Sequence, residues 1–317
     1  MFAALDSSAA EIRAVETRGL ARSFGQTVAV AGLDLQVAHG EMFGLVGPDG
    51  AGKSTAIRLL CGILRPTGGS GRVLGCDLAT QPEQVKARIG YLSQSFTLYG
   101  DLTVDENLEF FADLHGVRGY RPRRDELLEF TRLTPFRGRL AGALSGGMKK
   151  KLALACTLIH TPEIIFLDEP STGVDPVSRG EFWNILSGLL ARGVTIFMTT
   201  PYLDEAERCH RVGLMHHGRV FQSGTPAEVK ASLPGTVYDL HCPDLRAARR
   251  ALAGQTAEVS LVLYGDRLHL WDRQGETAAR AAAAWLDRNG LGPATLEPVA
   301  PSLEDVFVAR LGTGEQP

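Results

Sequence analysis

The sequence predicts an α/β protein with a parallel sheet core, an inserted helical lobe and a small α+β domain at its C-terminal end. Through the first two thirds of the 317 residues, short apolar, β-branched stretches alternate with helix-like ones, as in a covered parallel sheet. Residues 95–143 are helical in pattern, and the pattern changes again near Leu233-Pro-Gly235. We therefore expect two domains, 1–233 and 234–317.

The elements of the first domain follow from the period of their apolar residues. A stretch that alternates or is wholly apolar over a few residues is typical of a strand, and a longer stretch with a helical period is typical of a helix. In chain order we expect strands at Val15–Arg22, Val30–Val37, Glu41–Val46, Ile164–Leu167 and Val194–Thr199, and helices at Lys53–Leu64, Val104–His115 and Asp125–Leu133.

The second domain is expected to follow a β-α-β-β-α-β order. Gly265-Asp266 lies between two strand-like stretches and is a hairpin signal. The expected strands are Val237–His241, Val259–Leu263, Leu268–Trp271 and Ala294–Pro298, and the expected helices are Asp244–Ala253, Glu276–Arg288 and Ser302–Leu311.

Composition and charge indicate an ordinary globular protein. The chain is 44% hydrophobic and 22% charged, and its formal net charge is −3. A nucleic-acid partner usually requires a clustered basic face, so none is expected. The one basic run, Lys149-Lys-Lys151, is expected to be a solvated helix face.

Cysteine usage and the lack of apolar segments predict a cytoplasmic location. The five cysteines are odd in number and widely spaced, which favours reduced thiols over disulfides or a zinc site. Residues 1–17 contain three acidic residues and no basic region followed by an apolar core, so no signal peptide is expected. No stretch reaches the ~18 apolar residues of a spanning helix. Any role at a membrane would therefore require another chain to cross it.

A glycine-rich segment between a predicted strand and a predicted helix indicates a nucleoside triphosphate site. The segment matches G-x-x-x-x-G-K-[ST] in full, in the strand–loop–helix context that supports the motif. Its backbone N–H groups would wrap the phosphates, Lys53 would reach the β- and γ-phosphates, and Ser54 would hold Mg²⁺. The candidate ATP-binding residues of this loop are Gly47, Pro48, Asp49, Gly50, Ala51, Gly52, Lys53, Ser54 and Thr55.

Two further motifs narrow the family. Leu144-Ser-Gly-Gly-Met148 precedes the run Ile164-Ile-Phe-Leu-Asp-Glu-Pro170, with Asp168 twenty-three residues after Ser145. With the glycine-rich loop, these motifs resemble the nucleotide-binding subunit of ABC transporters, over roughly Val15 to Leu233. The resemblance implies a P-loop NTPase core (ABC ATPase) with an antiparallel β subdomain and a helical lobe.

The resemblance also implies roles for individual residues. Asp168 and Gln94, with Ser54, would bind Mg²⁺, and Glu169 would orient or deprotonate the attacking water. The expected catalytic residues are therefore Glu169, Gln94 and Lys53. Phe24 matches the aromatic residue that stacks on adenine, although a core phenylalanine is an alternative.

Other matching segments would act between two subunits. In this family two chains dimerise head to tail, so Ser145, Gly146 and Gly147 would cap an ATP held by the partner chain. Ser171–Asp175 matches the loop that communicates between the two sites. The stretch from Ser95 to Asn107 resembles the segment that touches the membrane permease subunit.

One position departs from the family pattern. Pro201 stands where the switch histidine is expected, and proline offers neither a side-chain donor nor a backbone N–H. The site is therefore expected to bind ATP but to hydrolyse it slowly. The nearby His210, His216 and His217 are not expected to replace the missing group.

These features predict an ATP-binding and hydrolysing subunit that powers export of an unidentified substrate. It would lie on the inner face of the cell membrane, attached to a separate permease, as one half of a nucleotide-sandwich dimer with itself or a second ATPase. A nucleotide-sensing regulatory subunit and a soluble ATPase acting on ribosomes or DNA are the alternatives. The segment Pro301–Phe307 resembles the end of drug-exporter subunits; the C-terminal domain could support dimers, regulate, or only cap the fold.

Overall fold

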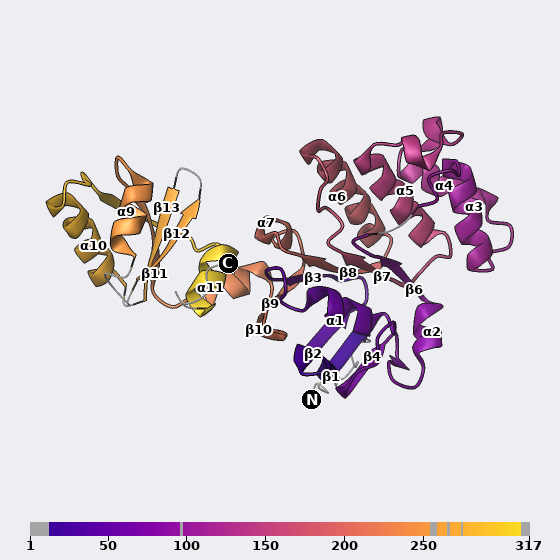
Figure 1. Ribbon diagram of the computed structural model, residues 1–317, viewed down its shortest axis with the longest axis horizontal. Helices are drawn as coiled ribbons and strands as arrows, with labels where there is room; N and C mark the ends of the chain where they lie inside the picture. The colour runs from indigo at the N-terminus through magenta and orange to yellow at the C-terminus, as the bar shows by residue number, and fades with distance from the viewer. Residues whose placement is uncertain (1–12, 96–97, 254–258, 265–266, 274, 312–317) are drawn as a thin grey trace, which may run out of the picture. The chain divides into compact units, whose positions relative to one another are not determined.

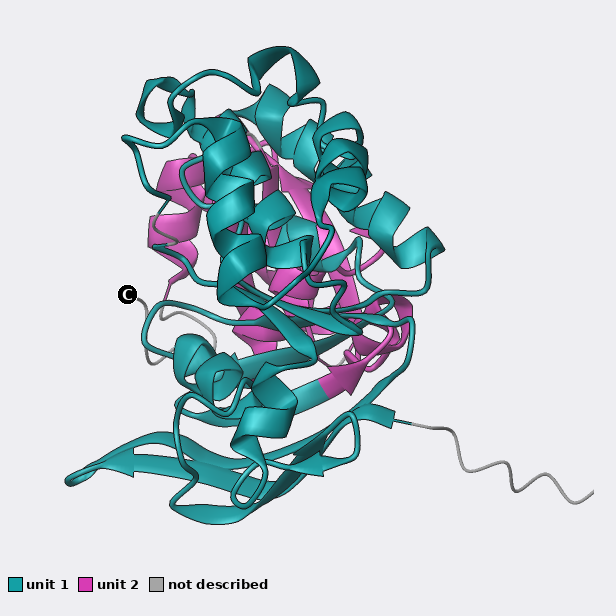
Figure 2. Ribbon diagram, turned by 90° about the vertical axis from the view of Figure 1, so that its right-hand side faces the viewer, with its two compact units in different colours: residues 1–222 teal, residues 223–317 magenta. Residues whose placement is uncertain are grey.

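The chain forms two compact units, residues 1–222 and 223–317, in a computed structural model (Figures 1 and 2). The structure describes residues 13–95, 98–253, 259–264, 267–273 and 275–311. The division falls eleven residues before the boundary expected from the sequence. The difference includes helix α8 (Pro226–Ala231), which packs against α11 (Leu303–Leu311) of the second unit.

A six-stranded sheet in the order β10-β9-β3-β8-β7-β6 forms the centre of the first unit. From β6 to β9 every neighbouring pair is parallel, so the carboxyl ends of these strands lie at one edge. Every residue of the three middle strands β3, β8 and β7 is buried, which accounts for their apolar runs; β8 also carries three buried threonines, and β7 ends at the buried Asp168. The strands are β3 (Met42–Val46), β6 (Ile89–Leu92), β7 (Ile164–Asp168), β8 (Thr195–Thr200), β9 (Arg211–His216) and β10 (Arg219–Gly224).

A separate antiparallel sheet in the order β2-β1-β4-β5 confirms the expected antiparallel β subdomain. Helix α1 (Lys53–Leu60) contacts strands of both sheets, and its buried Ile57 and Leu59 belong to the hydrophobic core that they share. The glycine-rich loop that precedes α1 is therefore held between the two sheets. The strands are β1 (Arg13–Phe24), β2 (Thr27–Ala38), β4 (Gly68–Val73) and β5 (Cys76–Asp77).

The helical lobe packs around α5, which contacts both α3 and α4, and also α6 of the core (Figure 1). Helix α4 begins at Arg121, a turn earlier than expected, because Pro122 lies in its first turn, where the missing N–H costs nothing. It ends at Phe130, two residues before Arg132 takes a positive φ of 59°. The remaining helices of this unit are α2 (Pro82–Lys86), α3 (Val104–Leu114), α4 (Arg121–Phe130), η1 (Thr134–Phe136), η2 (Ala141–Ala143), α5 (Gly146–Leu158), α6 (Pro176–Ala191) and α7 (Leu203–Ala206).

The second unit is a small α+β domain with an antiparallel sheet in the order β12-β13-β11-β14. Helices α9 and α10 cover the face that carries Leu240, Leu268 and Leu270. Helix α11 packs against β12 and β13, and His269 Nδ1 lies 3.0 Å from Asp305 Oδ2 of that helix. The predicted hairpin turn at 265–266 lies outside the described residues. The elements are β11 (Thr236–His241), α9 (Leu245–Leu252), β12 (Val259–Tyr264), β13 (Arg267–Asp272), α10 (Thr277–Arg288) and β14 (Thr295–Val299).

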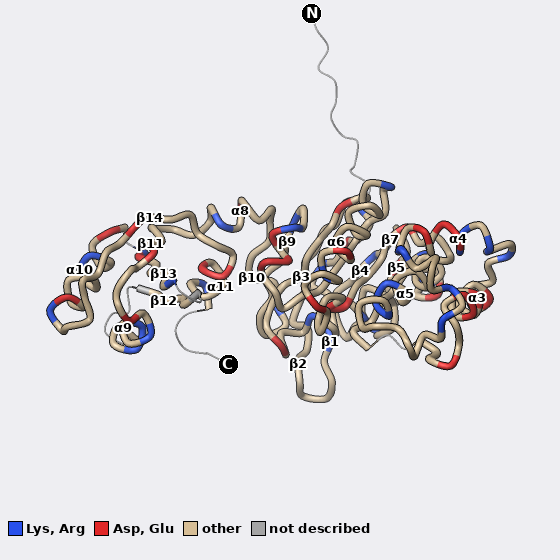
Figure 3. The backbone as a smooth tube through the Cα atoms, turned by 90° about the horizontal axis from the view of Figure 1, so that it is seen from above, with Lys and Arg blue, Asp and Glu red and all other residues tan. Residues whose placement is uncertain are grey.

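Charge is distributed without a dominant sign. Acidic and basic residues are interspersed along both units, with acidic residues grouped on α3 and arginines grouped on α9 (Figure 3). Among the described residues, no helix has the length and apolar character needed to cross a membrane.

Candidate nucleotide site

The glycine-rich loop, residues 47–55, joins β3 to α1 at the carboxyl edge of the central sheet. A Cβ atom on Gly47 would lie 2.1 Å from the carbonyl oxygen of Met215, and one on Gly52 would lie 2.3 Å from that of Ala29. Gly52 also has a φ of +102°. Glycine is therefore required at both positions by close backbone approach, and at Gly52 by conformation as well. Within the loop Asp49 and Gly50 are exposed, Ala51 is buried, and Pro48, Ser54 and Thr55 are half-buried.

Lys53 is buried at the start of α1. Its Nζ donates hydrogen bonds to the carbonyl oxygens of Gly47 at 2.8 Å and Pro48 at 3.0 Å. The same atom lies 3.2 Å from Glu169 Oε1, and both side chains are less than 10% exposed. A buried ammonium is costly unless it is paired, and here the loop carbonyls and a carboxylate supply the partners.

The carboxylates at the end of β7 lie against the loop. Asp168 Oδ1 accepts hydrogen bonds from Ser54 Oγ at 3.1 Å and from Thr199 Oγ1 at 2.7 Å. Asp168 is fully buried, and its Oδ2 has no hydrogen-bond partner among the described residues. A buried carboxylate oxygen without a partner, next to a serine hydroxyl, is a donor set that suits Mg²⁺. Thr199, which completes this group, was not singled out from the sequence.

Glu169 is held in an unusual backbone conformation. Its φ is +47°, which costs a non-glycine residue of order 1–3 kcal/mol. The Glu169 N–H donates to the carbonyl oxygen and to Oγ1 of Thr199, both at 3.1 Å. Gln94, in the loop after β6, donates from Nε2 to Glu169 Oε2 at 3.0 Å. The three residues expected to be catalytic, Lys53, Gln94 and Glu169, are thus brought into direct contact.

The switch segment, Thr199–Glu207, begins at the end of β8 beside the loop. Gly47 N–H donates to the carbonyl oxygen of Thr200 at 3.4 Å, so Pro201 directly follows a residue that touches the glycine-rich loop. His210 is remote from this point. Its Nδ1 accepts from the N–H of Met42, which lies at the opposite end of β3 from the loop. This contact holds His210 away from the glycine-rich loop, and the expectation that no nearby histidine replaces the missing one stays a prediction.

Glu205 is a buried carboxylate that sequence reasoning missed. It is 1% exposed and accepts hydrogen bonds from Ser171 Oγ and, at 2.7 Å, from Thr200 Oγ1. Arg179 Nε of α6 lies 3.9 Å away. Glu205 therefore joins the switch segment to the loop Ser171–Asp175. An acidic residue in the first turn of a short helix is typical of a solvent-exposed helix N-terminus. No local sequence signal indicates that Glu205 contacts these distant partners.

Ser145, Gly146 and Gly147 lie at the start of α5. Ser145 is the N-cap, and its Oγ accepts from the Met148 N–H at 3.3 Å. Ser145 and Gly146 are exposed, whereas Gly147 is buried against Ser178 of α6. None of the hydrogen bonds described for these residues reaches the loop 47–55 of the same chain.

Phe24 is at the exposed end of β1. It is 45% exposed, which rules out the alternative that it is a core residue. The Arg22 guanidinium lies 4.6 Å from the centre of its ring. One face of this ring is thus occupied by a cation, and stacking on adenine stays a prediction.

The run Lys149–Lys151 is not the solvated face that the sequence suggested. Lys149 is exposed, but Lys150 Nζ donates to the Gln94 carbonyl oxygen at 3.3 Å, and Lys151 is buried and paired with Glu181 of α6. Burial lowers the pKa of Lys150. The expectation is wrong because α5 is packed on several sides, so consecutive lysines meet different neighbours.

The fold and this constellation define the class: an ATP-binding cassette. A family model described as ABC transporter matches residues 30–172. The chain is 39% identical over 310 residues to the daunorubicin/doxorubicin resistance ATP-binding protein DrrA of Streptomyces peucetius, covering 95% of this chain and 93% of that protein. The chain belongs to the ATP-binding proteins of the ABC transporter family.

Other relatives and solved structures agree. Identity is 43% over 220 residues to the probable multidrug ABC transporter ATP-binding protein YbhF of Escherichia coli, covering 68% of this chain but only 38% of that protein. The chain thus spans little more than a third of that relative. The structure of an ATP binding subunit of an ABC transporter matches with a TM-score of 0.62 and 30% identity, over 68% of this chain and 92% of that one. The structure of cbiO1 from Clostridium perfringens matches with a TM-score of 0.63 and 25% identity, over 77% and 96%.

Proposed function

We propose that this chain binds ATP with Mg²⁺ and hydrolyses it slowly to energise export through a separate membrane permease. The observation that carries the proposal is the contact of Lys53, Gln94 and Glu169 beside a switch segment with proline at position 201. Relatives named for daunorubicin resistance and for Nod factor export support a role in export. The choice of cargo is assigned to the permease.

The Lys53–Glu169 ion pair suggests how the site works. When a triphosphate binds, its β- and γ-phosphate oxygens would replace the Glu169 carboxylate at Lys53 Nζ. Glu169 would then be free to orient a water molecule for attack on the γ-phosphorus and to take its proton, with ADP as the leaving group. Gln94, hydrogen-bonded to Glu169, would limit where that carboxylate can move.

Mg²⁺ would be held by Ser54 Oγ, Asp168 and the amide oxygen of Gln94. When bound, it would neutralise charge on the phosphate oxygens. The partnerless Asp168 Oδ2 is the observation that supports this assignment. Thr199 would keep Asp168 oriented through the 2.7 Å hydrogen bond to Oδ1.

Pro201 supports the proposal that turnover is slow. Residue 201 follows Thr200, which touches the glycine-rich loop, so a histidine here would lie beside the phosphates. Proline cannot donate a hydrogen bond to the γ-phosphate or to Glu169. We propose that the chain forms the weaker half of a nucleotide-sandwich dimer, with Ser145–Gly147 completing a site on the partner.

A rate measurement tests this. The ATPase rate of the purified chain with Mg²⁺ is compared with those of Pro201→His and of Pro201→Ala, which restores the N–H without an imidazole. We expect ATP binding by all three, slow turnover by the parent and Pro201→Ala, and a gain of at least about tenfold for Pro201→His. A parent rate per chain that already climbs steeply with protein concentration would refute the weak-half assignment. Binding without turnover in every variant would instead favour the nucleotide-sensing function.

An apolar surface beside the Gln94 loop is the proposed docking site for the permease. Ile63, Tyr99, Phe110 and Leu114 are exposed apolar side chains, and Ile63 and Phe111 line a cavity of about 260 Å³. The ring centre of Phe110 lies 5.5 Å from that of Phe111 and 4.6 Å from that of Tyr99. Tyr99 lies within the stretch that resembles the permease-contacting segment. Phe110→Asp is expected to prevent co-purification with the permease while ATP still binds. Ala281→Asp, at an exposed position of α10, is the control for an added charge; retention of the permease by Phe110→Asp would refute the docking site.

A further inference from the structure

Two helices carry the segments proposed to meet the partner subunit. Ser145 directly precedes α5 (Gly146–Leu158), and Asp175, the last residue of the loop Ser171–Asp175, directly precedes α6 (Pro176–Ala191). Each of these residues caps its own helix. Ser145 Oγ accepts from the Met148 N–H, and Asp175 Oδ1 accepts from the Ser178 N–H at 2.9 Å. The position of each segment therefore follows the position of the helix that it starts.

The first two turns of α5 and α6 are in contact. A Cβ atom on Gly147 would lie 2.3 Å from Ser178 Oγ, so glycine is needed for the helices to approach at this level. One turn further along, Lys151 Nζ pairs with Glu181 Oε2. The Lys151 side chain is 9% exposed and that of Glu181 is 36% exposed. The two contacts follow the i, i+4 and i, i+3 spacing of single helix faces.

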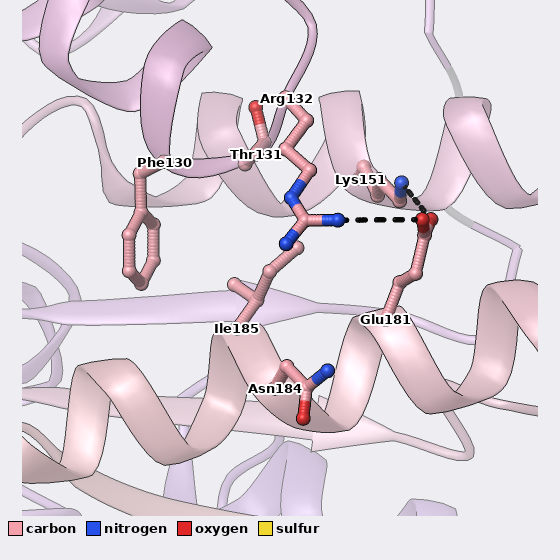
Figure 4. A pocket seen from close by; sticks show the side chains of 7 residues that line it. All are labelled: Phe130, Thr131, Arg132, Lys151, Glu181, Asn184 and Ile185. Carbon is pink, nitrogen blue, oxygen red and sulfur yellow. Dashed lines mark hydrogen bonds and ion pairs between the residues drawn. The ribbon is translucent and has the colours of Figure 1, made fainter.

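Arg132, just after α4, is a second cation near Glu181, but its interaction with that carboxylate is weaker. Its Nη1 lies 3.8 Å from Glu181 Oε1, and its side chain is 76% exposed (Figure 4). An exposed pair at this distance contributes little. In the pair with Lys151 the lysine end is largely shielded from water, and the ammonium is costly to leave there without its carboxylate. Below the ion pairs, Phe130, Asn184 and Ile185 line a cavity of about 150 Å³ between α4, α5 and α6.

We propose that Lys151 and Glu181 form a clamp that fixes α5 on α6, so that Ser145–Gly147 and Ser171–Asp175 move as one body. Lys151 is thus a positioning residue. It would keep Ser145–Gly147 and Ser171–Asp175 in a fixed arrangement as they approach the ATP bound by the partner chain. This inference rests on the proposed sandwich dimer. The clamp would also explain why a buried charge is retained in a helix that is otherwise apolar along Leu152–Leu158.

The run of three lysines provides its own control. Lys151→Met keeps most of the apolar stem while removing the charge. Lys149→Met makes the same change two residues earlier, at an exposed position of the same helix. The double variant Lys151→Glu/Glu181→Lys reverses the pair and should restore it, because the partners remain opposite in sign.

Hydrogen exchange of the full chain is the first measurement. Lys151→Met is expected to raise exchange at least about tenfold in residues 145–150 and 171–179 together, with Leu152–Leu158 unchanged. The charge reversal should bring both segments back toward the parent, and Lys149→Met should change neither. Faster exchange in only one segment, an increase throughout α5, or no rescue by the charge reversal would overturn the clamp.

The second measurement is ATP-driven self-association in a Glu169→Gln background, by sedimentation. Lys151→Met is expected to weaken the dimer about tenfold while a fluorescent ATP analogue binds the single chain with unchanged affinity. An unchanged dimer would overturn the clamp alone. If the Glu169→Gln parent stays monomeric in ATP, the sandwich of two copies is refuted, and hydrogen exchange then decides whether the clamp exists.

Discussion

Replacing the hydroxyl of Thr199 on β8 by a methyl group, in Thr199→Val, should lower the free energy of unfolding far more than the same change at Thr195. Thr199 Oγ1 donates to the buried Asp168 carboxylate at 2.7 Å and accepts from the Glu169 N–H at 3.1 Å. Thr199→Val is nearly isosteric, so little cavity forms and the loss is mainly that of hydrogen bonds. A hydrogen bond to a charged group is worth roughly 1.5–3 kcal/mol. The second bond adds less, because the Glu169 N–H also reaches the Thr199 carbonyl oxygen at 3.1 Å.

The expected loss in the free energy of unfolding is therefore about 2–3 kcal/mol, or roughly 30- to 140-fold in the unfolding equilibrium. Thr195→Val is the matched control. Thr195 is equally buried on the same strand, but its Oγ1 accepts only from the Gly40 N–H, at 3.0 Å, among the hydrogen bonds described. We expect about 1 kcal/mol for that change.

Urea denaturation followed by tryptophan fluorescence measures both losses, since Trp183 lies in the first unit, and ATP binding with Mg²⁺ is measured in parallel. Thr199→Val should weaken Mg²⁺-dependent binding because Asp168 loses a fixed orientation, whereas Thr195→Val should leave it intact. Equal destabilisation by the two changes, or unaltered nucleotide binding in Thr199→Val, would refute the assigned role of Thr199.

Two further predictions follow from close packing and burial. Gly47→Ala should abolish ATP binding, because its Cβ would lie 2.1 Å from the backbone oxygen of Met215, which cannot move aside cheaply. Gly138→Ala, with no atom within 4 Å of the new Cβ, should bind ATP normally; binding by both would contradict the required close approach at Gly47. In the folded chain at pH 8, a thiol reagent should modify Cys242 first, because the other four thiols are buried away from the reagent and burial raises the pKa of Cys209 to about 12. Mass spectrometry measures the order in which the cysteines are modified. The prediction would be wrong if any buried thiol reacted as fast as Cys242 in the native protein; the buried thiols are those of Cys61, Cys76, Cys156 and Cys209.

The α/β core and the glycine-rich loop could be predicted because their signals are local. An apolar strand, a glycine-rich turn and a helix lie within about twenty residues, and consecutive residues determine the backbone conformation of this unit. Pro201 was likewise recognised from its neighbours alone. The helix starting at Arg121 was misplaced because a proline inside a charged stretch signals a break as readily as a first turn.

The sequence by itself determined the strand–loop–helix unit of the site, the order of its motifs and the proline at the switch position. Only the tertiary structure decided that Thr199 orients Asp168, that Glu205 joins two loops, and that Lys151 is buried against Glu181. The partners in these contacts are separated by 30 or more residues in the sequence. The exception is the hydrogen bond from Thr200 to Glu205 within the switch segment. The physical reason is that helical and strand periods report which face of an element is buried. They do not report which distant side chain will lie against that face.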